Sequence, residues 1–133
     1  MPLWTTYLAN WANHKEEILK AIEATSKRKA ALLKFVMRNR GNDEVAPTKE
    51  MLTAYKKGEI TWEQYEKRYN NRLLGDLADE WVFDVIQDLK AGIQVLLICY
   101  EKDPNHCHRR LLAEWIENYD SNIDYRGEIT LEV

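Results

Sequence analysis

The segment Cys99–Arg110, CYEKDPNHCHRR, concentrates reactive side chains and holds both cysteines of the chain. It follows an unbroken apolar run, which is typical of a strand covered on both faces in a parallel sheet, and it precedes a helical pattern. Parallel sheets bind ligands beyond the carboxyl ends of their strands, where helix N-termini point outward. The segment is therefore predicted to form the edge of a ligand pocket, with Cys99 at the strand end.

The residue types in this segment indicate nucleophilic or acid–base chemistry on an anionic ligand. A cysteine at a helix start has free amides nearby, which lower the pKa of its thiol, so Cys107 is the candidate thiolate. Glu101 and His108 are candidate acid–base groups. Arg109 offers a planar pair of donors suited to a carboxylate or phosphate, and Lys102 offers a second anion contact.

Each of these residues also has a structural interpretation. Cys99 can act as a small buried hydrophobe. His108 falls on the apolar stripe of its helix, where a core histidine can hold a loop carbonyl. Arg109 can pair with Glu101 or Asp103.

Several known catalytic patterns are absent. A Cys-x5-Arg phosphatase loop needs arginine at position 105 or 113, and these are Asn105 and Ala113. The five glycines stand apart, so the chain has neither a Walker motif nor a GxGxxG turn.

Zinc could be proposed from Cys99, His106, Cys107 and His108. Adjacent Cys and His ligands, however, do not match the common structural zinc spacings. We therefore expect no metal and no cofactor.

Strand and helix patterns alternate along the chain. Strands are predicted at Leu3–Ala9, Ala31–Arg38, Ile93–Tyr100 and Gly127–Val133, and helices at His14–Lys29, Thr48–Gly58, Thr61–Leu73, Asp79–Gly92 and His106–Tyr119. Thr61 with Gln64 forms a capping-box pattern, whereas Ala31–Arg38 could instead continue the preceding helix. The alternation predicts an α/β fold: one three-layer domain over residues 1–133, with a mainly parallel, Rossmann-like sheet flanked by helices.

Composition limits the partners. The formal net charge is -3, so no global field would draw the chain onto nucleic acid or an anionic membrane. The N-terminus lacks the pattern of a signal peptide or a membrane anchor, and two cysteines suit a reducing compartment. We expect a cytoplasmic protein with no membrane partner and no indicated nucleic-acid partner.

Three segments carry a family resemblance. LLICYEKDPNHCHRRLLAEWI resembles the signature of the family known as domain of unknown function 488, in which a C-x-E-K-type strand end is followed by a CHR triplet at a helix start. TTYLANW is similar to the family's TSYFAN segment, and LTAYKKGEITWEQYEKRY is similar to its middle helix region. The chain departs from shorter members at MRNRGNDEVAP and in a longer helix between Asn13 and Lys29.

The resemblance implies a single α/β domain from bacteria, archaea or their viruses, with the motif residues gathered at one site. It adds five binding residues to those of the segment, namely Tyr7, Asn10, Arg38, Tyr65 and Tyr69. The family name assigns no activity.

Two main hypotheses of function follow. The first is an enzyme acting on a phosphorylated or nucleotide-like small molecule at the Cys99–Arg109 site. The second is a non-catalytic module that binds or sequesters such a ligand. A third, thiol redox or metal switching by Cys99 and Cys107, is the weaker alternative.

Overall fold

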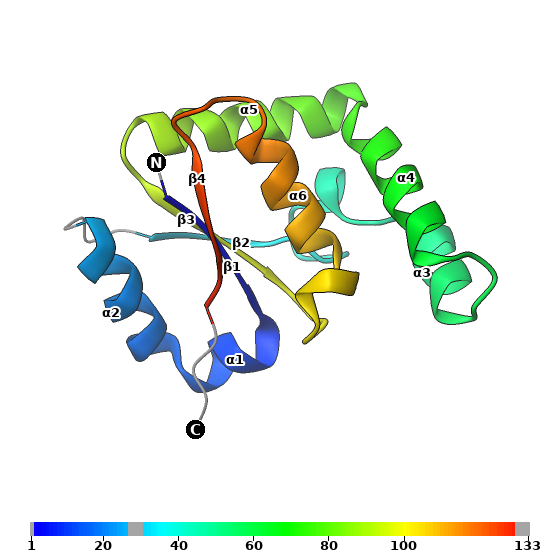
Figure 1. Ribbon diagram of the computed structural model, residues 1–133, viewed down its shortest axis with the longest axis horizontal. Helices are drawn as coiled ribbons and strands as arrows, with labels where there is room; N and C mark the ends of the chain where they lie inside the picture. Colours follow the sequence, from blue (N-terminus) through cyan, green and yellow to red (C-terminus); the bar gives the residue numbers. More distant parts are fainter. Residues whose placement is uncertain (1, 27–30, 130–133) are drawn as a thin grey trace.

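The computed structural model describes residues 2–26 and 31–129 of the chain (Figure 1). Its strands are β1 (Pro2–Tyr7), β2 (Ala31–Phe35), β3 (Gln94–Cys99) and β4 (Asp124–Glu128). Its helices are α1 (Leu8–Asn13), α2 (Lys15–Ser26), α3 (Lys49–Lys56), α4 (Trp62–Leu73), α5 (Asp76–Lys90) and α6 (His108–Glu117), with 3-10 turns η1 (Asp43–Val45) and η2 (Pro104–His106). The α/β prediction is confirmed.

The four strands form one sheet in the order β2-β3-β1-β4, and all three strand pairs are parallel. β3 is paired on both sides, and all six of its residues are buried. Val95, Leu97 and Cys99 join the core cluster that includes buried residues of α4, α5 and α6, whereas Leu96 and Ile98 join a second cluster with α1 and α2. Both faces of β3 are therefore covered, which gives three layers and explains its unbroken apolar run.

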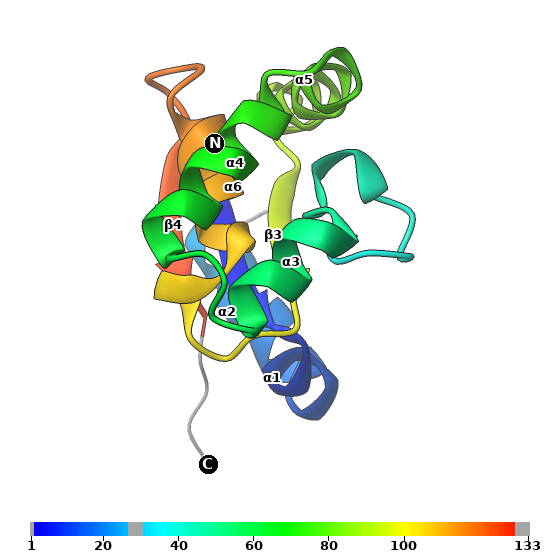
Figure 2. The same ribbon diagram turned by 90° about the vertical axis from the view of Figure 1, so that its right-hand side faces the viewer.

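Local signals position two of the helices beside the end of β3. The Thr48 side chain accepts a hydrogen bond from the Met51 amide at the start of α3. Thr61 and Gln64 form the predicted capping box at the start of α4. Figure 2 views the molecule from the side of these two helices.

The first strand is shorter than predicted. β1 ends at Tyr7, and Leu8 and Ala9 belong to α1 instead. Asn10 donates from Nδ2 to Thr6 Oγ1 at 3.0 Å and to the Ile129 carbonyl at 2.7 Å. These buried bonds hold α1 against the ends of β1 and β4. The residue types in LWTTYLA predict a strand but cannot indicate such bonds.

Other boundaries were also wrong. β2 ends at Phe35 rather than Arg38, although the choice of strand over helix is confirmed. α5 begins at Asp76 rather than Asp79, since Gly75 is its N-cap. The last strand is Asp124–Glu128 rather than Gly127–Val133; residues 130–133 of that prediction, and residues 27–29 of the first predicted helix, lie outside the described residues.

The final helix also begins later than its sequence pattern indicated. Asp103 caps the short turn η2 by accepting from the Asn105 amide at 2.9 Å, and α6 starts only at His108. Cys107 is the N-cap of α6 rather than a first-turn residue. Its thiol still lies at the positive end of a ten-residue helix.

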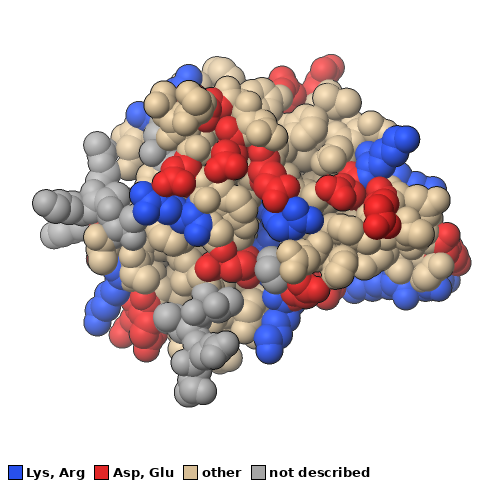
Figure 3. All heavy atoms as spheres, in the orientation of Figure 1, with Lys and Arg blue, Asp and Glu red and all other residues tan. Residues whose placement is uncertain are grey.

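Within the described residues, no helix combines the length and apolar character needed to cross a bilayer. Acidic and basic side chains are interspersed on the face shown in Figure 3.

Candidate functional site

A cavity of about 540 Å³ lies at the carboxyl end of β3. Its walls come from the segment after β2, from α3 and α4, and from the β3–α6 connection. The lining residues are Met37, Arg38, Asn39, Pro47, Leu52, Tyr55, Lys56, Tyr65, Cys99, Tyr100, Glu101, Asp103, His106, Cys107 and His108. This volume suits a small organic ligand, and the location is the one expected for parallel sheets.

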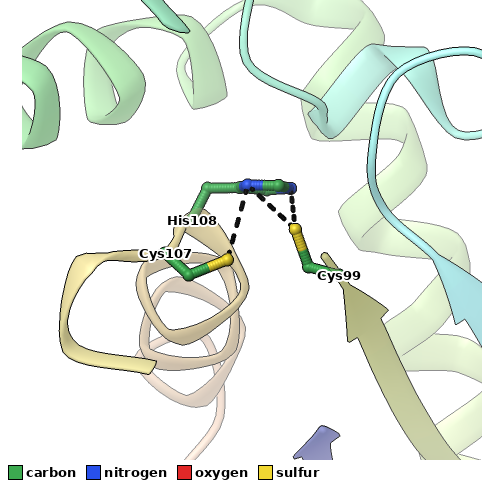
Figure 4. Close-up of side chains that lie close together, drawn as sticks. All are labelled: Cys99, Cys107 and His108. Carbon is green, nitrogen blue, oxygen red and sulfur yellow. Dashed lines mark hydrogen bonds between the residues drawn. The ribbon is translucent and has the colours of Figure 1, made fainter. Parts of the chain in front are cut away.

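Two sulfurs and an imidazole meet in the wall of this cavity (Figure 4). His108 Nδ1 lies 3.5 Å from Cys99 Sγ and 3.9 Å from Cys107 Sγ. All three residues are buried, and neither cysteine is in a disulfide. β3 supplies one sulfur, while the start of α6 supplies the other together with the ring.

A backbone carbonyl determines which nitrogen of the His108 ring carries a hydrogen. Nε2 lies 2.6 Å from the Val36 carbonyl oxygen, which can only accept, so Nε2 carries a hydrogen and donates it. In a neutral ring, Nδ1 is then the acceptor near the two thiols, while Cys99 Sγ also lies 3.7 Å from Nε2. The Tyr69 ring packs against the imidazole at 5.5 Å between centroids and helps to hold it in place.

The two cysteines have opposite protonation preferences. The hydrogen bond from Cys99, with further contributions from His108 and Arg109, lowers the pKa of Cys107 well below its usual value despite burial. The same contact with Cys107, together with burial, raises the pKa of Cys99. The pair therefore favours a thiolate on Cys107 that accepts the Cys99 S–H, in agreement with the position of Cys107 at a helix N-terminus.

Arg109, which the sequence predicted as a direct anion contact, is not among the residues that line the cavity. Its side chain is fully buried, and Nε and Nη2 donate to the Glu128 carboxylate at 2.8 and 2.9 Å. It also donates to the carbonyls of Glu101 and Lys102. Burial acts to lower the pKa of Arg109, but the hydrogen bond to Glu128 and the nearby negative charges of Cys107, Glu128 and Cys99 together outweigh it, so the net pKa is raised. Arg109 thus holds the β3–α6 loop against β4.

The cavity gathers some of the predicted binding residues and leaves others out. Arg38, Tyr65, Cys99 and Glu101 line it together with Cys107 and His108. Tyr7, Asn10, Tyr69 and Lys102 do not. Tyr7 pairs in register with Cys99 on the neighbouring strand, and the Tyr69 hydroxyl donates to the buried Val45 carbonyl at 2.5 Å.

Sequence reasoning missed a wall contributed by α3. Tyr55 and Lys56 line the cavity, and the Tyr55 ring lies 5.3 Å from that of Tyr65 and 5.5 Å from that of Trp62. Lys56 Nζ lies 3.6 Å from the Glu101 carboxylate, although both side chains are substantially exposed. No local signal links α3 to the β3–α6 loop, because the two are far apart in sequence and meet only in the folded chain.

Comparison with known families agrees with the sequence resemblance. Residues 39–120, more than half of the chain, match the family described as "Active DUF488-N3 subclade". This chain belongs to the DUF488 family, whose name assigns no function. The matched region contains every residue that lines the cavity except Met37 and Arg38. Searches of curated proteins and of solved structures gave no significant match.

Proposed function

We propose that the chain is an enzyme that binds a small, anionic, phosphorylated or nucleotide-like molecule in this cavity and attacks it with Cys107. The observation that carries the proposal is the placement of the Cys107 sulfur beside His108 Nδ1 in the wall of a ligand-sized cavity. A thiol next to an imidazole whose orientation is fixed by a third group is the arrangement that activates cysteine nucleophiles. Here the third group is the Val36 carbonyl.

The chemical step follows from the two sulfur–imidazole contacts. His108 Nδ1 takes the Cys107 proton, and Cys99 stabilises the resulting thiolate by donating its S–H. The thiolate electron pair forms a bond to an electrophilic carbon of the ligand while the bond to the leaving group breaks. The leaving group departs with that bonding pair and takes the proton from the His108 imidazolium. Water then attacks the same carbon, His108 Nδ1 takes a proton from the water, and the Cys107 thiolate leaves with the C–S bonding pair, which restores the enzyme.

The cavity walls support an anionic ligand that carries a ring. Arg38 and Lys56 are the cations among the lining residues, and we assign to them the anion contact that the sequence had indicated for Arg109. Tyr55 and Tyr65 offer apolar faces against which a ring can pack. Glu101 can accept hydrogen bonds from ligand hydroxyls.

A second candidate function is ligand binding without turnover. It is favoured by the burial of both sulfurs, which leaves only 2% of Cys107 and 3% of Cys99 exposed. Such a module would use the same cations and aromatic walls but would need no nucleophile.

The test begins with a thermal-shift screen of the native protein against nucleotides, sugar phosphates and other phosphorylated metabolites. Ligands that stabilise the protein are then incubated with it, and the products are analysed by mass spectrometry. We expect Cys107→Ser to retain binding and to lose turnover by about 10²-fold or more. Turnover at the native rate in Cys107→Ser would refute the nucleophile, and stabilisation without any product would favour the binding module.

The anion contact has a matched pair of variants. Lys56→Ala removes a lining cation, whereas Lys57→Ala removes its exposed neighbour, which does not line the cavity. We expect Lys56→Ala, but not Lys57→Ala, to weaken binding of the ligand found in the screen. Equal effects would contradict the assignment of the anion site.

A further inference from the structure

Cys99, Cys107 and His108 form a cluster that meets the requirements of a metal site. Each offers one ligand atom, and the three atoms lie within 4.8 Å of one another. Thiolate sulfur and imidazole nitrogen are the donors that zinc and other thiophilic ions prefer. Figure 4 shows the imidazole ring edge-on, with both sulfurs close to it on the same side.

The distances match the edges of a tetrahedron around a zinc ion. With Zn–S near 2.3 Å and Zn–N near 2.0–2.1 Å, tetrahedral angles place sulfur and nitrogen about 3.6 Å apart. His108 Nδ1 lies 3.5 and 3.9 Å from the two sulfurs. Two of the three edges of the ligand triangle therefore fit a bound zinc ion, and the third, between the two sulfurs, is at most 4.8 Å, against roughly 3.8 Å in tetrahedral coordination.

The surroundings of His108 also suit a metal ligand. A ligating histidine commonly donates its other ring N–H to a carbonyl or carboxylate, which fixes its orientation. His108 Nε2 already donates to the Val36 carbonyl, so Nδ1 is the nitrogen left to bind a metal.

Charge balance favours a divalent ion at this position. Two thiolates neutralise the charge of a dication, so the bound set can remain buried without a net charge. The nearest buried cation, Arg109, is paired with the Glu128 carboxylate. The site therefore does not depend on an outside counter-ion.

The backbone at Cys107 explains how adjacent residues can share one ion. Cys107 has an extended conformation, with φ -136° and ψ 142°, whereas His108 is the first residue of α6. The change in backbone direction brings two consecutive side chains to the same point. We expected no metal because adjacent Cys and His ligands do not match the common structural zinc spacings, and that comparison takes no account of the backbone conformation at Cys107.

We propose that Cys99, Cys107 and His108 bind one zinc ion or a similar thiophilic divalent cation, with a fourth coordination position facing the cavity. The ion engages the electron pairs of Cys107, so its binding blocks the nucleophile. Metal binding itself is independent of the proposed function, but this inhibitory consequence rests on it. Chelation would then activate the enzyme.

Cobalt substitution tests the binding directly. The reduced native protein is titrated with Co²⁺ under anaerobic conditions, and the absorption of cobalt–thiolate charge transfer and of the ligand-field bands is recorded. We expect saturation at one ion per chain, an intensity typical of tetrahedral coordination, and displacement by Zn²⁺. Absence of thiolate charge transfer in the native protein would overturn the proposal.

Variants identify the ligands. Cys99→Ser and Cys107→Ser are each expected to reduce the charge-transfer intensity, whereas His14→Gln, at the C-cap of α1, should leave the spectrum unchanged. Circular dichroism shows whether each variant is folded. As a measurement on the native protein, Zn²⁺ should protect both thiols from alkylation and a chelator should restore their reactivity; unprotected thiols at saturating Zn²⁺ would contradict the site.

The outcomes separate the two proposals. A native protein that shows no thiolate–cobalt absorption but turns over its ligand through Cys107 refutes the metal site and leaves the proposed function intact. A protein that binds cobalt through both cysteines but shows no turnover after chelation refutes the nucleophile and leaves the metal site intact.

Discussion

Replacing Glu128 with alanine tests whether Arg109 is a structural clamp. The substitution removes both carboxylate oxygens from a guanidinium that has no exposed side-chain surface. The carbonyls of Glu101 and Lys102 remain as acceptors. Arg109 would keep its charge inside the protein with only these partial partners.

The magnitude follows from the burial of the pair. Removing one partner of a buried ion pair costs roughly 3–5 kcal/mol, and the remaining carbonyls place this case near the lower end, at about 3 kcal/mol. With a urea m-value of about 2 kcal/mol/M, the midpoint of unfolding should fall by about 1.5 M. The assay is urea denaturation followed by circular dichroism.

Arg110 and Glu114 provide the matched control. Their N–O distance is 2.9 Å, against 2.8 Å for Arg109 and Glu128, but their side chains are 24% and 46% exposed. Glu114→Ala should therefore cost only about 0.5 kcal/mol. Equal destabilisation by Glu128→Ala and Glu114→Ala would refute the argument that burial makes the Arg109 pair important.

A double substitution separates the charge effect from the loss of packing. Replacing Arg109 with methionine in the Glu128→Leu background removes the buried charge together with its partner. We expect the double variant to be more stable than Glu128→Ala. A double variant that is less stable would show that the hydrogen bonds to the loop carbonyls contribute more than the removal of the charge restores.

Three further predictions concern other parts of the site and its supports. Tyr69→Phe removes the donor to the buried Val45 carbonyl and should lower the free energy of unfolding by about 1–3 kcal/mol, measured by urea denaturation; a change below the error of the method would contradict it. Thr61→Ala removes the N-cap of α4 and should cost about 1 kcal/mol in the same assay, whereas an unchanged midpoint would show that the cap is not needed. In the metal-free native protein at neutral pH, iodoacetamide should label Cys107 before Cys99, because the pKa of the first is lowered and that of the second is raised; peptide mass spectrometry showing the reverse order would oppose the thiolate assignment.

Much of the fold could be predicted because its signals are local. The side chains of the capping residues Thr48 and Thr61 accept hydrogen bonds from backbone amides in the first turn of their own helices. A short stretch of sequence is therefore enough to predict where these helices begin. The apolar run of β3 directly reflects its position between two helix layers. The end of β1 was missed because Asn10 bonds to Ile129, which is 119 residues away in sequence.

Part of the candidate site was also readable from the sequence. Cys99, Glu101, Cys107 and His108 stand close together on one strand–loop–helix unit, and that unit has a known place in parallel sheets. The resemblance to the family added Arg38 and Tyr65, which line the cavity, but also Tyr7, Asn10 and Tyr69, which do not. Similarity to a family motif shows which residue types the two sequences share, but it does not show what each residue contacts.

The sequence by itself determined the α/β class, the capped helices, the buried central strand and the segment that holds the reactive groups, because these depend on periodicity and on contacts between near neighbours. Only the tertiary structure decided that Arg109 pairs with Glu128, that α3 supplies Tyr55 and Lys56, and that the Val36 carbonyl orients His108. Each of these contacts joins residues that are far apart along the chain. Their energies depend on burial and on the precise approach of side chains, and neither is encoded in any short stretch of sequence.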